Sequence, residues 1–170
     1  GGTVIENVSE PTLTAYAPAV APAAGTAVIL LPGGGLRLLS ISDDTQYVIR
    51  RLNERGVTVF VLKYRVLQQR PQPAGATGPA GAGIERLPKL VIRNANANPA
   101  PDDKALAEVL DFAAADAQRA LQMVRAAAQR WQIDPARVGF LGYSAGGGVA
   151  LAEYLRAPAG SRPDFIATSY

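Results

Sequence analysis

The stretch GFLGYSAGGG, residues 139–148, decides how the rest of this sequence is interpreted. An apolar run at 138–141 leads into the segment GYSAG, residues 142–146, and a helix-forming segment follows. In the pattern G-x-S-x-G a serine sits on a tight strand-to-helix turn, where flanking glycines let strand and helix close together. Such a turn lifts the hydroxyl above the C-terminal edge of a sheet and points helix N-terminal amides at it. The pattern predicts a nucleophilic Ser144.

A glycine-rich turn without chemistry, as found in nucleotide-binding sheets, is the competing interpretation. A dinucleotide site would need G-x-G-x-x-G after the first strand, with an acidic residue about 20 positions later. Neither GGGLRL, residues 33–38, nor GYSAGGG, residues 142–148, fits that pattern. The serine interpretation is therefore preferred.

A second glycine cluster, LLPGGGL at residues 30–36, follows an earlier apolar run. Enzymes that carry a nucleophilic serine on such a turn place one half of the oxyanion hole in a loop after an earlier strand. Glycines suit that loop because a backbone N–H must approach the substrate oxygen without an intervening side chain. Alone, the cluster could be an ordinary loop. Upstream of the serine turn, and at the exit of a strand, it supports the same interpretation.

Composition excludes several classes of protein. With 170 residues, 48% of them hydrophobic, and a net charge of +3, the chain is typical of one soluble globular domain. Arginines are scattered without a basic run, so we expect no nucleic-acid partner. The absence of cysteine excludes disulfides, thiolate metal sites and a cysteine nucleophile. The apolar runs are too short to cross a bilayer, so we expect no membrane partner. No metal or cofactor is expected.

Apolar runs alternate with helical patterns along the chain, without an internal repeat. Short apolar runs bounded by turn residues are typical of buried parallel strands. Strands that alternate with helices predict an α/β fold, with a mostly parallel sheet covered by helices on both faces. We expect strands at 3–8, 12–18, 26–32, 57–64, 138–141 and 164–170, and helices at 42–56, 116–131 and 145–155. Asp43 is expected to cap the first helix.

The segment at about 66–115 breaks this rhythm, because its first half is rich in Pro, Gly and Ala and lacks periodicity. One interpretation is a flexible surface insertion. The other is a lid or wall over a site, since long irregular loops in compact domains tend to be functional. We expect the sheet to resume after it, so that it marks no domain boundary.

Several segments together resemble the N-terminal portion of an α/β-hydrolase. The resemblance is to esterases that act on acylated plant polysaccharides, of the acetyl-xylan and feruloyl esterase type, related to the hormone-sensitive-lipase-like enzymes. It is carried by NVSEPTLTAYAP (7–18), AVILLPGGG (27–35), RRLNERGVTVFVLKYR (50–65), DAQRALQMVR (116–125), IDPARVGFLGYSAGG (133–147) and RPDFIATSY (162–170). Pro32 departs from the pattern, since many relatives have histidine before the glycines.

This resemblance implies that residues 1–170 form the N-terminal portion of a single α/β-hydrolase domain. It implies a serine hydrolase that cleaves carboxylic esters, including acyl groups on carbohydrates, through an acyl-enzyme on Ser144. It also implies an oxyanion hole made by the amides of Ala145 and of Gly34 or Gly35. The substrate would be a small ester or an acylated carbohydrate. We expect a secreted or periplasmic bacterial protein.

A serine nucleophile needs a base, and the sequence contains no histidine. In this fold the triad follows the chain order serine, acid, histidine, with the last two after strands beyond the nucleophile. Asp164 precedes its strand and belongs at the opposite sheet edge. Asp116 and Asp134 are expected at helix starts, as caps. The three lysines, Lys63, Lys89 and Lys104, have no serine–lysine motif around them.

Two hypotheses follow. In the first, the acid and histidine belong to the remaining C-terminal half of the same hydrolase, either continuous with this chain or present as a separate chain. The segment 1–170 alone would then be inactive. In the second, the protein is a non-catalytic, ligand-binding pseudo-hydrolase.

Overall fold

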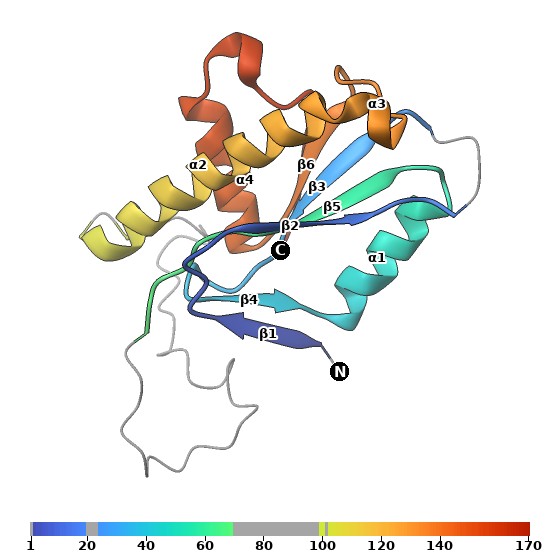
Figure 1. The fold of residues 1–170 in the computed structure, drawn as a ribbon. Helices are drawn as coiled ribbons and strands as arrows, with labels where there is room; N and C mark the ends of the chain where they lie inside the picture. The colour runs from blue at the N-terminus through green and yellow to red at the C-terminus, as the bar shows by residue number, and fades with distance from the viewer. Residues whose placement is uncertain (1, 20–23, 70–98, 101) are drawn as a thin grey trace.

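A five-stranded sheet with helices on both faces forms the centre of the structure (Figure 1). Its strands stand in the order β2–β5–β3–β6–β7, where β2 is antiparallel to β5 and all other neighbours are parallel. The computed structural model describes residues 2–19, 24–69, 99–100 and 102–170. The elements are β1 Thr3–Glu6, β2 Thr12–Tyr16, β3 Ala27–Leu31, β4 Leu38–Ile41, α1 Asp43–Asn53, β5 Thr58–Lys63, α2 Lys104–Ala126, α3 Ala128–Trp131, β6 Val138–Tyr143, α4 Ala145–Arg156, a 3-10 turn at Ala159–Ser161, and β7 Ile166–Ser169. The predicted α/β fold is confirmed.

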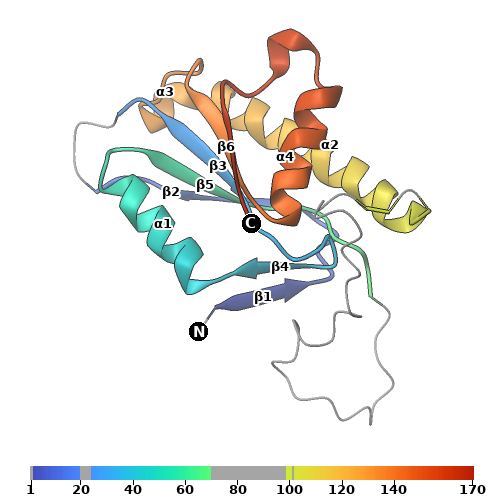
Figure 2. The same cartoon turned by 180° about the vertical axis from the view of Figure 1, so that it is seen from behind.

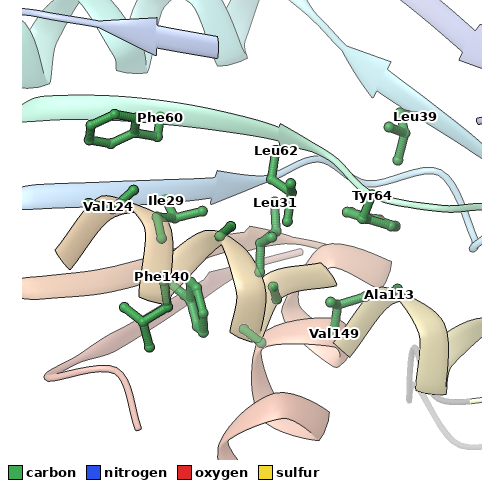
Figure 3. Close-up of a cluster of buried hydrophobic side chains, with 14 of the residues drawn as sticks. Ile29, Leu31, Leu39, Phe60, Leu62, Tyr64, Ala113, Val124, Phe140 and Val149 are labelled. Atoms are coloured by element: carbon green, nitrogen blue, oxygen red, sulfur yellow. The ribbon is translucent and has the colours of Figure 1, made fainter. Parts of the chain in front are cut away.

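Apolar side chains are buried on both faces of the sheet because helices pack against each face of its central strands. Ile29 of β3 points into the larger cluster, which includes Phe140 and Val149 and lies beneath α2 and α4 (Figure 3). The next residue, Leu30, points to the opposite face and packs with Ile49 of α1. Successive side chains of a strand point to opposite faces, so the continuous apolar run of β3 supplies both clusters.

The strand β7 is covered far less than the centre of the sheet. Every residue of β3 is buried, whereas Ile166 is half-buried and Ala167, Thr168 and Ser169 are exposed. Among the described residues, β7 pairs with β6 alone, which leaves its other edge open. Figure 2 shows this last strand at the margin of the sheet, beside α4.

Local signals misplaced some element boundaries. The first strand pairs antiparallel with β4, a strand that the sequence did not predict. Helix α1 is capped by Ser42, whose hydroxyl accepts a hydrogen bond from the Thr45 N–H, so the expected cap at Asp43 was wrong. Ser42 already holds the extended backbone of a cap, and Asp43 therefore begins the helix.

Helix α2 begins at Lys104, twelve residues before the expected start at Asp116. The C-terminal part of the segment 66–115 is thus helical, and residues 70–98 of it, including the expected lid, lie outside the described residues. Asp103 caps this helix by accepting from the Leu106 N–H. No helix in the described residues is both long and apolar enough to cross a lipid bilayer.

Candidate active site

Two neighbouring parallel strands bring the two glycine motifs together. Strand β3 pairs with β6 so that Leu31 lies opposite Gly142. Parallel strands end at the same edge of a sheet, so the loop after β3 and the turn after β6 leave it side by side. This register, rather than any sequence proximity, brings Pro32 and Gly33 to the turn that carries Ser144.

Ser144 occupies a strained turn between β6 and α4. Its φ of 48° and ψ of −116° lie outside the regions that L-residues favour. The Ser144 N–H donates to the carbonyl oxygen of Ser169 at 2.8 Å, and its carbonyl accepts from the Gly147 N–H at 2.8 Å. The side chain is exposed, and its hydroxyl makes no hydrogen bond within the described part of the chain. The backbone is therefore fixed while the side chain stays exposed.

The flanking glycines are required by space. A Cβ on Gly142 would lie 2.5 Å from the carbonyl oxygen of Gly146. A Cβ on Gly146 would lie 2.1 Å from the carbonyl oxygen of Leu31 and 2.7 Å from that of Pro32. Backbone atoms cannot move aside as flexible side chains can, so only glycine lets α4 start this close to β3.

The loop after β3 touches the serine turn directly. A Cβ on Gly33 would lie 2.9 Å from the Tyr143 carbonyl oxygen and 3.3 Å from the Ser144 Cβ. Gly34 and Gly35 follow with φ values of 138° and 63°. The Gly34 carbonyl accepts from the N–H groups of two later residues, whereas the N–H groups of Gly34 and Gly35 have no acceptor within the described residues. The loop therefore carries two backbone N–H groups without an acceptor in the residues that directly follow its contact with the serine turn.

The side chain of Tyr143, the residue before Ser144, packs against the smaller apolar cluster, which contains Leu30 and Ile49. Burial, and to a smaller degree the charge of Asp44, raises the pKa of Tyr143. The phenol therefore stays neutral near pH 7 and adds no negative charge beside Ser144.

Two residues after β5 that sequence analysis passed over support this edge of the sheet. Tyr64 is fully buried, and its hydroxyl donates to the Pro32 carbonyl oxygen at 2.5 Å. Arg65 binds Asp116 of α2 through its guanidinium, with the closest N–O distance 2.6 Å, and through its backbone N–H. A polar Tyr-Arg pair ending an apolar strand was the signal that could have identified them.

The acidic residues examined from the sequence do not form a triad with Ser144. Asp116 lies in the middle of α2, so its expected role as a helix cap was wrong; it is buried and paired with Arg65. Asp134 accepts from the Ala136 N–H in a turn that does not become helical. Asp164 precedes β7, accepts from the Val138 N–H at the start of β6, and pairs with Arg125. It therefore lies at the sheet edge opposite Ser144, as predicted.

One further carboxylate is buried, but it lies toward the C-terminal end of α4, whereas Ser144 precedes the N-terminal end. Glu153 is 2% exposed, and neither of its carboxylate oxygens has a hydrogen-bond partner among the described residues. Nine residues of helix separate it from Ser144, about 14 Å along the axis. It borders a hollow of about 350 Å³ between α2 and α4, and a second hollow of about 420 Å³ lies beside α1. Ser144 lines neither hollow.

Comparison with known proteins agrees with this geometry. Residues 100–169 match the sequence model of a family described as having the alpha/beta hydrolase fold. Over 147 residues the chain is 26% identical to an acetylxylan esterase of Xylanibacter ruminicola, an alignment that covers 86% of this chain and 22% of that protein.

Solved structures show the same fold. An acetyl ester-xyloside bifunctional hydrolase of Caldicellulosiruptor lactoaceticus matches with a TM-score of 0.55 and 23% identity, over 98% of this chain and 56% of that one. A thermophilic esterase of Thermogutta terrifontis matches with a TM-score of 0.58 and 21% identity, over 99% and 53%. Brefeldin A esterase, a bacterial homologue of human hormone-sensitive lipase, matches with a TM-score of 0.53 and 18% identity, over 91% and 34%. The chain thus spans about a fifth of the curated relative and about half or less of these structures.

Proposed function

We propose that this chain, an α/β-hydrolase by fold and similar to esterases, is the nucleophile-bearing portion of a serine carboxylic ester hydrolase. The observation that carries the proposal is Ser144, exposed and strained at the start of α4, next to the glycine loop that follows β3. A serine hydroxyl held in this way can attack an ester carbonyl once a base removes its proton.

The oxyanion hole in this proposal uses the N–H of Ala145 and that of Gly34 or Gly35. Ala145 is the first residue of α4, where backbone N–H groups lack an acceptor within the helix. The positive end of the helix dipole adds to the stabilisation of a negative oxygen there. In this proposal the N–H groups of the glycine loop, which have no acceptor among the described residues, would donate to the tetrahedral intermediate together with Ala145; the contact of Gly33 with the serine turn supports this arrangement.

The acid and the histidine would come from a companion segment that continues the sheet beyond β7. Support comes from the open edge of β7 and from exposed apolar side chains nearby. Leu155 is 76% exposed and Tyr170 is 75% exposed, and Leu151 of α4 is also exposed. An open strand edge beside exposed apolar side chains is a surface that proteins normally cover. The greater length of the related structures supports the same companion, either continuous with this chain or as a separate chain.

The substrate class proposed is acylated carbohydrate, with small esters as simpler substrates. The similarity to an acetylxylan esterase and to an acetyl ester-xyloside hydrolase supports this choice. Such polymers are met outside the cytoplasm, so a secreted or periplasmic bacterial location fits the same proposal. No nucleic-acid, membrane or cofactor role is part of it.

The test compares the chain alone with the complete protein that includes the companion segment. A fluorophosphonate should label Ser144 rapidly in the complete protein and at least about a hundredfold more slowly in residues 1–170, because loss of triad members removes most of the activation. Ser144→Ala is the control for site of labelling. Release of acetate from acetylated xylo-oligosaccharides, compared with release from 4-nitrophenyl acetate, tests the substrate class. Rapid labelling of the isolated chain would contradict the need for a companion.

A second candidate function is a ligand-binding pseudo-hydrolase, favoured by the absence of histidine from the chain. In that case the complete protein would neither react with the phosphonate nor hydrolyse esters. It would still bind acetylated oligosaccharides in a calorimetric titration.

A further inference from the structure

The loop after β3 is tied at both ends to the segment that follows β5. At its start, the Tyr64 hydroxyl donates to the Pro32 carbonyl oxygen at 2.5 Å. At its end, the Leu67 N–H donates to the Leu36 carbonyl oxygen at 2.7 Å. Both bonds join residues more than thirty positions apart in the sequence, so the neighbouring strand exit holds the glycine loop in addition to the loop's own turn hydrogen bonds.

The segment that makes these ties is itself fixed. Arg65, between the two donors, binds Asp116 through its backbone N–H at 3.0 Å and through its guanidinium. Asp116 is buried within α2, so this pair fixes the strand exit to the helix above it. Tyr64 has no exposed surface, and its burial raises the pKa of the phenol, which therefore remains a donor across the physiological range.

The Pro32 carbonyl lies between the glycine loop and the first turn of α4. Its oxygen lies 2.7 Å from the place where a Cβ on Gly146 would be, directly against the first turn of α4. One residue later, Gly33 contacts the turn that carries Ser144. A rotation of the Pro32 peptide would therefore move the unpaired N–H groups of the glycine loop relative to the serine.

We propose that Tyr64 is a positioning residue for the oxyanion hole, acting through its hydrogen bond to the Pro32 carbonyl. This inference rests on the esterase function proposed above. Tyr64 does not touch the substrate; its hydroxyl fixes the peptide from which the glycine loop starts. A donor displaced from the developing oxyanion loses much of its effect, because such stabilisation depends on geometry set before the reaction. The Leu67–Leu36 bond acts in the same way at the other end of the loop.

The test replaces Tyr64 by phenylalanine in the complete protein. Removing a whole oxyanion donor typically lowers kcat by 10² to 10³, so a loosened one should lower it by about 10 to 100. KM should stay within about twofold, because the interaction strengthens only in the transition state. The rate of phosphonate labelling should fall by a similar factor. Val59→Ala, which weakens packing on the opposite face of the sheet, is the control for general destabilisation and should leave kcat unchanged.

A second readout does not depend on activity. Amide hydrogen exchange of a peptide covering residues 36–41, in which the N–H groups of Arg37, Leu38 and Ser40 donate to the carbonyls of Gly34 and Gly33, should quicken at least about tenfold in Tyr64→Phe and stay unchanged in Val59→Ala. Leu67→Pro removes the donor at the other tie and should give the same pattern, which keeps the test available if Tyr64→Phe does not fold. Unchanged exchange, or an unchanged kcat in an active enzyme, would overturn the inference. An inactive wild type with faster exchange in the variant would contradict the esterase proposal alone.

Discussion

Gly146 packs so closely on Leu31 that a Cβ on the glycine would lie 2.1 Å from the Leu31 carbonyl oxygen. This contact joins the first turn of α4 to the end of β3, and so joins the two halves of the candidate site. The Leu31 oxygen belongs to the backbone of β3 and the added Cβ would be fixed to the backbone of α4, so the conflict can be relieved only if the helix moves away from the sheet. The close approach of α4 to β3 therefore depends on the absence of a Cβ at position 146.

Gly146→Ala should destabilise the fold by about 3 kcal/mol, at the upper end of the usual cost of overpacking. Gly160→Ala is a matched control, because a Cβ there meets no atom within 4 Å, and it should change the free energy of unfolding by less than about 0.5 kcal/mol. Urea unfolding of the two variants in the complete protein measures both effects. Equal stabilities would mean that α4 is not held against β3 as described.

Neighbouring glycines of the loop should respond differently to the same change. Gly34 has a φ of 138°, and a Cβ there would lie 2.1 Å from the Leu38 carbonyl oxygen; Gly35 has a φ of 63° and open space around it. Gly35→Ala should therefore cost about 1 kcal/mol, from backbone strain alone. Gly34→Ala should cost more than about 2 kcal/mol and lower kcat by about a hundredfold if the loop forms the oxyanion hole. Unfolding curves and ester hydrolysis rates of both variants check this order, which a reversed result would contradict.

The strain at Ser144 gives a prediction about stability rather than rate. A residue with a side chain in such a conformation costs about 1–3 kcal/mol, and glycine escapes most of it while adding entropy to the unfolded chain. Ser144→Gly should thus be about 1 kcal/mol more stable than Ser144→Ala, although both abolish labelling by the phosphonate. Thermal and urea unfolding of the pair give the difference. If the alanine variant were the more stable, the turn would not be strained in solution.

The central architecture was predictable because each signal was local and strong. Continuous apolar runs gave β3, β5 and β6, and the glycines around Ser144 gave the strand-to-helix turn. Strand β4 was missed because its four residues follow the glycine loop directly and pair with β1 in a separate two-stranded sheet. The start of α2 was missed because the adjoining Pro, Gly and Ala-rich composition suggested that the whole segment was irregular.

The site was predictable only where its residues follow one another in the chain. Ser144, Ala145 and the glycine cluster could be recognised from motifs, although their roles stay proposals. The bonds of Tyr64 to Pro32 and of Arg65 to Asp116 join positions 32 and 51 apart, and no local pattern encodes such pairings. Asp116 was therefore interpreted as a helix cap, whereas in the structure it is a buried partner of Arg65 in the middle of α2.

Glu153 should make stability depend on pH. Burial raises the pKa of this carboxyl to about 7, and the nearby charges of Arg125 and Arg162 only partly oppose the rise. Below about pH 4 the group is protonated in both the folded and the unfolded chain, so it costs nothing. As pH rises toward 7, the unfolded chain ionises while the folded one stays neutral, and stability falls. Above pH 7 the loss is complete, on the order of 3 kcal/mol.

Glu153→Gln should therefore raise the free energy of unfolding at pH 8 by up to about 3 kcal/mol and change it little at pH 4.5. A glutamine cannot ionise, so any cost of its unpaired amide is the same at every pH. Glu108→Gln, an exposed position on α2, is the matched control and should leave the pH dependence as in the wild type. Urea midpoints of the complete protein between pH 4.5 and 8.5 provide the measurement. A gain for Glu153→Gln that is equal at both ends of this range would show that the carboxyl is not buried without a partner.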